Sequence, residues 1–353
     1  MCRVPRQTLR IIDANCNRIG EGLRFLEDIA RFILNDAQLS HELKTTRHSL
    51  IDSLSNFGAE SLSARDPTGD IGQNIKSIGQ HHDLASLVTA NAKRVEEALR
   101  VTEELAKLPD ISPTLSAKQF EQARFTVYLL ERELLAKLLR QAKVKGITGL
   151  YVIIDTQIIS HENILDVARK TIRGGAKALQ LRDKLANKRT LFNIARDFAG
   201  LCHESNCLFI MNDYLDIAIA AHADGLHVGQ DDLPLEIVRR ELPIDKIVGV
   251  SARTLAEAQK AEAEGADYIA VGSIFPSPTK REAEVVGLER LKQVKQAISI
   301  PVVAIGGINK ENICQVMTLD VSAIAVISAV FSETNIEKAT HQLVRQLEKE
   351  SHK

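Results

Sequence analysis

The sequence predicts an all-α domain followed by a (β/α)₈ TIM barrel. Three observations carry this prediction: the length of 353 residues, helical periodicity from residue 8 to about 141, and a switch to short apolar strands alternating with helices from Gly149 onward. A chain of this length exceeds one ordinary compact domain. We therefore place the helical domain at 1–142, a linker at 143–148 and the barrel at 149–353.

The helical domain contains a duplicated segment. Apolar residues recur in it at three- and four-residue intervals, which is the spacing of an amphipathic helix. Residues 14–24 match residues 90–100, and the match continues to 30 and 106 at a constant offset of 76. Two equivalent helices are therefore expected to pack about a local two-fold axis, with Gly22 and Ala98 as the small residues that allow a close approach.

The duplicated segments share charged residues at equivalent positions. Arg18, Glu21, Arg24 and Glu27 follow the spacing of ion pairs one helical turn apart. We interpret them as a surface ladder of ion pairs. The Asn and Arg residues that both copies share leave a binding site as the alternative.

Eight strand–helix units follow Gly149, which fits the small end of TIM barrels. An open doubly wound sheet is the alternative, but no GxGxxG opens a helix here. The strands are predicted at 150–154, 178–182, 208–211, 224–227, 247–250, 268–272, 301–305 and 323–327. The helices are predicted near 162–173, 188–202, 214–221, 234–241, 254–264, 287–297, 310–317 and 335–348.

Polar side chains gather where the predicted strands end, and this is the rim on which TIM barrels carry their sites. Gln180, Arg182 and Lys184 alternate in phase, so that all three face the same side of their strand. Asp213 and Asp232 follow the next two strands, where they suit Mg²⁺, although Asp232 before Pro234 also fits a helix cap.

Later strands end in further phosphate-binding features. A constrained loop with Ser277, Thr279 and Lys280 follows the sixth strand, Gly307 follows the seventh and Ser328 the eighth. In phosphate-binding barrels the last two of these loops supply backbone N–H groups to a phosphate. We interpret His227, within a strand, as a packed and hydrogen-bonded core residue.

Composition limits the partners. Lys plus Arg number 45 and Asp plus Glu 46, so no overall field favours nucleic acid or an acidic membrane. The five cysteines form no CxxC pair, which favours buried or incidental thiols in a reducing cytoplasm. No run of 18 apolar residues and no signal core is found in the sequence, so we expect a cytoplasmic protein.

Over residues 149 to about 348 these motifs resemble the thiamine-phosphate synthase family. The resemblance rests on Gln180-Leu181-Arg182-Asp183-Lys184, residues 223–232, Ser277-Pro278-Thr279-Lys280, residues 304–308 and Ala325-Val326-Ile327-Ser328. The helical domain is similar, more weakly, to the N-terminal extension of the long bacterial form. Arg253, where a neutral residue or His is frequent, is a departure at the edge of the pyrimidine pocket.

The resemblance implies a transferase. It would join 4-amino-2-methyl-5-(diphosphomethyl)pyrimidine to a (carboxy)thiazole phosphate, with Mg²⁺ as cofactor and with diphosphate leaving by dissociation. Arg182, Lys184 and Lys280 would be the catalytic cations, and Asp213 and Asp232 would hold the metal. The implied substrate-binding residues are Gln180, Asn212, Ser251, Ser277, Thr279, Gly307, Ile327 and Ser328.

Other interpretations remain open at this level. The barrel alone fits a thiazole-phosphate isomerase or regulator, although such a protein needs neither the cationic strand end nor both acids. The helical domain is either a docking or oligomerisation module, in which case a homo-oligomer follows, or a kinase that supplies the pyrimidine diphosphate. No GxxxxGK[ST] supports the kinase. Because the predicted barrel is complete from Gly149, a chain that begins near Lys145 is expected to fold.

Overall fold

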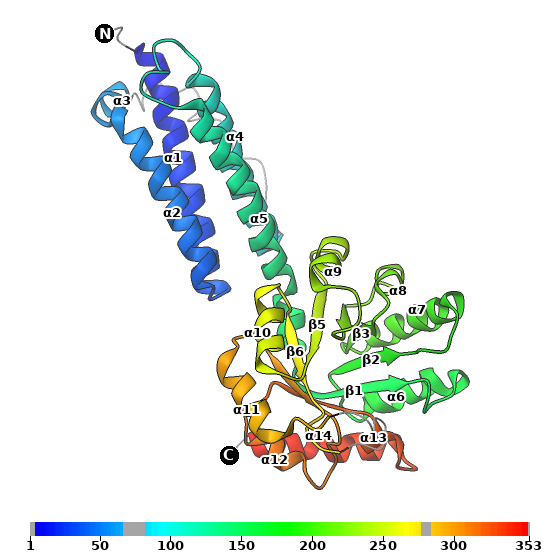
Figure 1. Cartoon of the computed structure of the whole chain (residues 1–353). Helices are drawn as coiled ribbons and strands as arrows, with labels where there is room; N and C mark the ends of the chain where they lie inside the picture. Colours follow the sequence, from blue (N-terminus) through cyan, green and yellow to red (C-terminus); the bar gives the residue numbers. More distant parts are fainter. Residues whose placement is uncertain (1–3, 66–81, 277–283, 352–353) are drawn as a thin grey trace. The chain divides into compact units, whose positions relative to one another are not determined.

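The computed structural model describes residues 4–65, 82–276 and 284–351, and the chain divides into two compact units, 1–139 and 140–353. The first unit is helical and the second is an α/β barrel, and each is described by itself (Figure 1). The helices of the first unit are α1 Arg6–Asp28, the π-helical turn Ile29–Ile33, α2 Ala37–Leu54, α3 Gly58–Ala64, α4 Leu84–Leu105 and the greater part of α5 Ala117–Gly146.

The duplicated segments form α1 and α4, which pack against each other. A Cβ added to Gly22 would lie 2.4 Å from Cγ2 of Val95, so only glycine permits this approach. Asn15 and Asn91 each donate a side-chain hydrogen bond to the backbone carbonyl four residues earlier, at 2.8 and 2.9 Å. The two copies therefore share conformation as well as sequence.

Of the shared glutamates, Glu21 and Glu97 are exposed, as a surface ladder requires, but Glu27 and Glu103 are buried, which corrects the interpretation at that position. Glu27 and Glu103 are each only 4% exposed. Arg24 and Arg100 do pair with them across one turn, at 3.7 and 2.8 Å.

Each glutamate also accepts hydrogen bonds from the next helix of its own copy. Arg47 of α2 donates to Glu27 through Nε at 3.2 Å and through Nη2 at 3.0 Å. Arg124 of α5 donates to Glu103 through the same two atoms, at 3.3 and 3.2 Å. We name these contacts the two clamps; they extend the duplication into a second pair of helices, which the sequence pattern did not indicate.

Eight parallel strands close into a barrel in chain order, β1 to β8, and helices surround it (Figure 1). The strands are β1 Gly149–Asp155, β2 Ala178–Arg182, β3 Leu208–Asn212, β4 Gly225–Val228, β5 Ile247–Ala252, β6 Tyr268–Val271, β7 Val302–Ile305 and β8 Ala323–Val326. The helices are α6 Ile164–Arg173, α7 Lys188–Glu204, α8 Leu215–Ala220, α9 Leu235–Glu241, α10 Leu255–Ala263, α11 Gly287–Ala297, α12 Ile313–Met317, α13 Ser328–Phe331 and α14 Ile336–Ser351. The predicted fold class is confirmed, with short α13 as an addition.

Two apolar layers result from the alternation of side chains along the strands. One set, which includes Leu150, Val152 and Leu179, packs outward against the helices. The other set, which includes Tyr151, Ile153 and Ile210, fills the barrel interior. Polar residues that continue the interior set past the strand ends therefore emerge at the carboxyl-end rim, which we call the mouth.

The end of α5 closes the opposite face of the barrel, where a linker was expected over 143–148. The helix continues to Gly146 because Val144 and Ile147 pack into the interior core. Arg140 forms an ion pair with Asp267, between Nε and Oδ1 at 3.0 Å, and Lys143 pairs with Asp245, also at 3.0 Å.

Asp267 is 7% exposed and is also paired with Arg239. A chain that began near Lys145 would leave this buried carboxylate with one arginine in place of two. The barrel unit begins at Arg140, and whether a chain from Lys145 folds stays a prediction, with a loss of stability now expected for it.

No helix among the described residues is long and apolar enough to cross a membrane. Of the four cysteines described, Cys202 and Cys207 are buried, Cys16 is half-buried and Cys314 is exposed, and all are free thiols.

Candidate active site at the barrel mouth

Strand register brings the first two charged side chains of the mouth together. Asp155 ends β1 and is the register partner of Arg182, which ends β2. Their side chains form an ion pair between Oδ2 of Asp155 and Nη1 of Arg182. Asp155 is 2% exposed, whereas the Arg182 side chain is 20% exposed, so the guanidinium is the group open to the mouth.

Two carboxylates approach each other after β3 and β4. Asp213 adopts a left-handed backbone conformation with φ of +61°, and its N–H donates to the carbonyl of His227 at 2.9 Å. Burial raises the pKa of the Asp213 carboxyl, and contact with the carboxyl of Asp232 raises it further, against the lowering effect of Lys184. Two acids held close together are a poor arrangement for stability and a natural one for a divalent cation.

Lys184 is the cation that faces this pair in the described structure. Its Nζ lies 2.5 Å from Oδ2 of Asp213, and its side chain is 41% exposed. The ion pair with Asp213 raises the pKa of the lysine, so it carries its charge at neutral pH. The in-phase residues predicted on β2 thus do reach one mouth.

Asp232 does not cap the following helix. The N-cap of α9 is Pro234, which has no side-chain hydrogen bond to offer. Oδ2 of Asp232 instead accepts the N–H of Gly229 at 2.7 Å, which fixes the carboxylate beside the end of β4. The cap interpretation is wrong, because α9 begins only at Leu235 and the Asp232 carboxylate is engaged by Gly229.

A polar chain crosses the upper layer of the barrel interior. Gln180 donates to Oη of Tyr151 at 2.8 Å, and Oη of Tyr151 lies 3.0 Å from Oη of Tyr268. His227 continues the chain, with Nδ1 3.1 Å from Oη of Tyr268 and Nε2 2.9 Å from Oγ of Ser251. His227 is therefore a packed, hydrogen-bonded residue, as its place in a strand predicted.

This polar chain depends on one glycine. A Cβ at Gly249 would lie 2.0 Å from Cζ of Tyr268, so β5 must lack a side chain there for the ring to fit. Burial raises the pKa of both tyrosines, which keeps their hydroxyls protonated and able to bridge the donors around them. The chain holds Gln180 and Ser251 in fixed positions on different sides of the mouth.

The loop after β7 touches the loop after β6. Gly307 has φ of +67°, and a Cβ there would lie 2.5 Å from the carbonyl oxygen of Pro276. Asn312 fixes the same turn by donating to the carbonyl of Gly307 at 2.9 Å. Ile327 follows β8 directly, and Ser328 is the first residue of α13. The start of a helix offers backbone N–H groups without partners inside the helix, which suits an anion.

Three predicted site residues, Ser277, Thr279 and Lys280, lie outside the described residues. Asn212 ends β3 and is buried, 7% exposed, with Oδ1 and Nδ2 on the interior side by alternation. Gln180 lies in the middle of β2, and the other predicted residues lie at the carboxyl ends of their strands or in the segments that follow.

Sequence reasoning missed the acids that hold the cations in place. Asp155 shares the alternation of Tyr151 and Ile153, which was the signal available for it. Asp183 is 1% exposed, and its Oδ1 accepts the N–H groups of Leu185 and Ala186 at 2.8 and 2.9 Å. It shapes the loop from which Lys184 extends.

The mouth fits a magnesium ion by its donor set. No group of three or more His, Cys, Asp or Glu side chains that could hold a metal is found among the described residues. A zinc-type cage is therefore not present there, whereas Mg²⁺ typically takes one or two protein carboxylates and completes its shell with water and substrate phosphates. Asp213 and Asp232 match that requirement.

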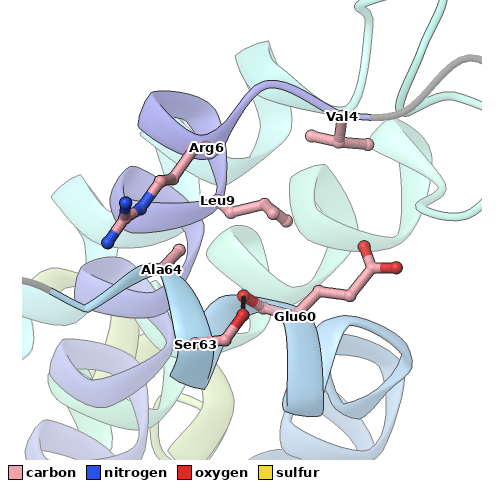
Figure 2. Close-up of a pocket in the computed structure, with 6 residues that line it drawn as sticks. All are labelled: Val4, Arg6, Leu9, Glu60, Ser63 and Ala64. Atoms are coloured by element: carbon pink, nitrogen blue, oxygen red, sulfur yellow. Dashed lines mark hydrogen bonds between the residues drawn. The ribbon is translucent and has the colours of Figure 1, made fainter.

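Two cavities lie away from the mouth. One, of about 630 Å³, is lined at the amino-terminal ends of β1 and β8 by residues that include Lys177, Lys295 and Asp320. The other, of about 250 Å³, lies in the helical unit between the start of α1 and α3 (Figure 2). In Figure 2 the charged ends of Arg6 and Glu60 project away from each other, so this cavity has no convergent polar groups.

Comparison with known proteins divides the chain in the same way. Residues 150–330 match the family model described as Thiamine monophosphate synthase, and residues 10–133 match the one described as the ThiD2 family. A thiamine-phosphate synthase of Synechocystis sp. is 39% identical over 346 residues, which cover 97% of each chain. The enzyme of the same name from Thermosynechococcus vestitus is 37% identical over 341 residues, covering 96% of this chain and 94% of that one.

A solved structure is also similar. The thiamine phosphate pyrophosphorylase from Pyrococcus furiosus is 39% identical and superimposes with a TM-score of 0.55, covering 59% of this chain and 98% of that chain.

Proposed function

Because this chain belongs to the thiamine-phosphate synthase family, we propose that the residues of its barrel mouth divide the two substrates of that reaction between them. The activity is an alkyl transfer in thiamine biosynthesis. An aminopyrimidine carrying a methylene diphosphate reacts with a thiazole phosphate to give thiamine phosphate and diphosphate. The observation that carries the proposal is the close pair of Asp213 and Asp232 with Lys184 and Arg182 beside it.

The diphosphate side of the mouth would be β2 to β4. Arg182 and Lys184 supply cationic N–H donors, and Lys280, from the loop after β6, would supply a third cation. Asp213 and Asp232 would hold Mg²⁺, which neutralises charge that develops on the departing phosphate oxygens. Gln180, Asn212 and Ser251 line the interior beneath them and would bind the pyrimidine ring.

The thiazole phosphate would bind on the opposite side. Gly307 and Ser328 offer backbone N–H groups to its phosphate, beside Ile327, and Ser277 and Thr279 add hydroxyl groups. Binding on opposite sides would let the thiazole nitrogen approach the methylene carbon of the pyrimidine across the mouth.

The reaction requires the protein to stabilise the charge of the leaving diphosphate and to hold the two substrates close together. The bond between the methylene carbon and the diphosphate oxygen breaks, and its electron pair leaves with the diphosphate. The amino group of the pyrimidine donates electron density to the methylene, so a dissociative step is chemically reasonable. The lone pair of the thiazole nitrogen then forms the new C–N bond. No protein base is needed, so Arg182 and Lys184 act by stabilising the leaving group and both pockets act by proximity.

The metal proposal has a direct test. Asp213→Asn should lower turnover by on the order of 10²–10³-fold, the scale for removing one group that stabilises developing charge. Asp231→Asn is the matched control, because Asp231 is the exposed neighbour of Asp232 in the same loop. Excess chelator should silence the wild type, and added Mg²⁺ should restore it. Full activity in excess chelator, with turnover of Asp213→Asn equal to that of the control, would exclude the metal role.

The helical unit has two candidate roles. The clamps pair the buried Glu27 and Glu103 within the unit itself, which supports a docking or oligomerisation module and, with it, a homo-oligomer. A kinase that makes the pyrimidine diphosphate is the alternative. Full-length protein supplied with pyrimidine monophosphate, ATP and thiazole phosphate distinguishes them, since only a kinase yields thiamine phosphate from that mixture. The cytoplasmic location stays a prediction.

A further inference from the structure

Asp155 and the residue after it both hold Arg182. The Asp155 carboxylate forms an ion pair with the Arg182 guanidinium, and the N–H of the next residue, Thr156, donates to the carbonyl of Arg182 at 3.0 Å. The carboxylate cannot swing away, because its Oδ1 accepts the N–H of Gln157 at 3.0 Å. With 2% of its surface exposed, Asp155 itself cannot reach a substrate.

The geometry leaves part of the guanidinium available. An arginine carries five N–H donors in a rigid planar fork. Asp155 engages Nη1, and no other hydrogen bond to the Arg182 side chain is found in the part of the chain that the structure describes. Because the fork is planar and rigid, a partner that fixes one nitrogen also fixes the direction in which the remaining donors point.

We propose that Asp155 is a positioning residue that aims the free donors of Arg182 at the diphosphate of the pyrimidine substrate. This inference rests on the role proposed above for Arg182. The arrangement suits a leaving group, since the charge-assisted contacts to the phosphate need no reorganisation of the arginine during the reaction. Without Asp155, the long side chain would sample several rotamers, and each productive contact would carry an added entropic cost.

A purely structural role of the Asp155–Arg182 pair predicts different effects of substitution. Burial of an ion pair stabilises the fold only when both partners are present, so a structural pair would affect unfolding and both substrates alike. A positioning role affects one substrate selectively. The thiazole phosphate is proposed to bind on the other side of the mouth, which makes it the internal reference.

The experiment compares Asp155→Asn, Asp155→Ala, Arg182→Ala and the double variant in the full-length protein. Asp166→Asn is the control, because Asp166 is an exposed acid on neighbouring α6. The readouts are KM for each substrate, kcat, inhibition by inorganic diphosphate and the melting temperature.

Asp155→Ala should raise KM for the pyrimidine diphosphate and the inhibition constant of diphosphate about tenfold, the scale for a misdirected charge-assisted contact. KM for the thiazole phosphate should stay within about twofold of the wild-type value. Asp155→Asn keeps an oxygen that can accept from Nη1 and should recover part of the loss. The double variant should be no worse than Arg182→Ala, because Asp155 acts through the arginine.

The inference is overturned if Asp155→Ala and Asp155→Asn change both KM values equally, lower only the melting temperature, or add their effects to those of Arg182→Ala. If Asp155→Ala does not fold, Asp155→Asn alone gives the same selectivity test. Arg182→Ala separates a failure of the role proposed for Arg182 from a failure of the inference about Asp155. If that variant leaves diphosphate inhibition unchanged, the proposed role of Arg182 fails, and this inference with it. If it weakens inhibition while the Asp155 variants do not, only this inference fails.

Discussion

Two buried glutamates of the helical unit and the two half-buried aspartates proposed to bind metal at the barrel mouth have opposite surroundings. Glu27 and Glu103 each have an arginine from the next helix and a second arginine one turn away. Asp213 has a single lysine and a second acid, Asp232, as its neighbours. Glu27 and Glu103 are thus each neutralised by arginines, whereas Asp213 and Asp232 leave negative charge in excess.

This difference separates acids that hold the fold from acids that wait for a ligand. A fully paired buried acid is costly to break, because removal of one partner strands the other charge. A crowded pair of acids should gain stability when one of them is replaced, and a bound cation would relieve the repulsion between them. Removing a partner of a paired acid should therefore lower stability, whereas changing an acid proposed to bind a ligand should lower activity.

The largest expected effect comes from removing a partner of Asp267 below the barrel. A chain that begins at Arg140 should fold, and one that begins at Lys145 should lose about 3–5 kcal/mol, because Asp267 then keeps only Arg239. Urea unfolding of both chains measures the difference. A full-length Arg140→Ala variant removes the same ion pair without truncation. Equal urea midpoints for all three proteins would show that the pair of Arg140 with Asp267 does not stabilise the fold.

The clamps should be the next most sensitive sites. Arg124→Ala leaves Glu103 with exposed cations only and should cost about 2–3 kcal/mol, somewhat below a fully buried pair since Arg124 is partly exposed. Arg47→Ala should cost a similar amount, because the second clamp repeats the first. Thermal unfolding reports the loss, while kcat of the synthase reaction should not change in either variant. A fall in kcat without a loss of stability would indicate that the clamps serve ligand binding and not the fold.

A smaller effect, confined to binding, is expected at the phosphate turn. Gly307→Val meets a backbone conformation of positive φ and the carbonyl of Pro276, so the turn must shift. KM for the thiazole phosphate should rise about tenfold or more, while inhibition by diphosphate stays near its wild-type value. Gly200→Val is the control, since a Cβ at Gly200 has open space around it. Unchanged KM for the thiazole phosphate would contradict the assignment of this loop.

The smallest effect is a pH dependence of stability that Asp213 should produce. The pKa of Asp213 is raised above the ordinary value of 3.8, chiefly by burial. The native protein therefore keeps a proton that the unfolded chain has released, so stability from this group is present at acidic pH and is lost as pH rises through the raised pKa. In chelator, the melting temperature of Asp213→Asn relative to wild type should rise as the pH is raised over the range above 3.8, and Mg²⁺ should reverse the rise. A constant difference across that range would mean that Asp213 is ionised throughout.

Much of the barrel is predictable from sequence because its strands are short apolar runs with a two-residue alternation. That alternation also predicted that Gln180, Arg182 and Lys184 reach one mouth. The partners of these cations were not predictable in the same way. Asp155 meets Arg182 only through the register of two strands far apart in sequence, and Asp213 meets Asp232 only because β3 and β4 are neighbours.

The helical unit shows the same limit. The duplication of α1 and α4 is visible in the sequence, but the depth of Glu27 and Glu103 is set by the packing of α2 and α5, where the two copies have little sequence in common beyond Arg47 and Arg124. Likewise, the extension of α5 to Gly146 depends on a barrel core that receives Val144, which no local pattern predicts.

Gly249 imposes a constraint on engineering of the pyrimidine side of the mouth. The missing side chain on β5 and the Tyr268 ring on β6 occupy one volume, so neither position can be varied without the other. Any library that enlarges residue 249 removes the tyrosine, and with it the bridge that joins Tyr151 to His227. Redesign for a different ring must therefore change residues 249 and 268 together. A larger residue at 249 does not fit while Tyr268 is present.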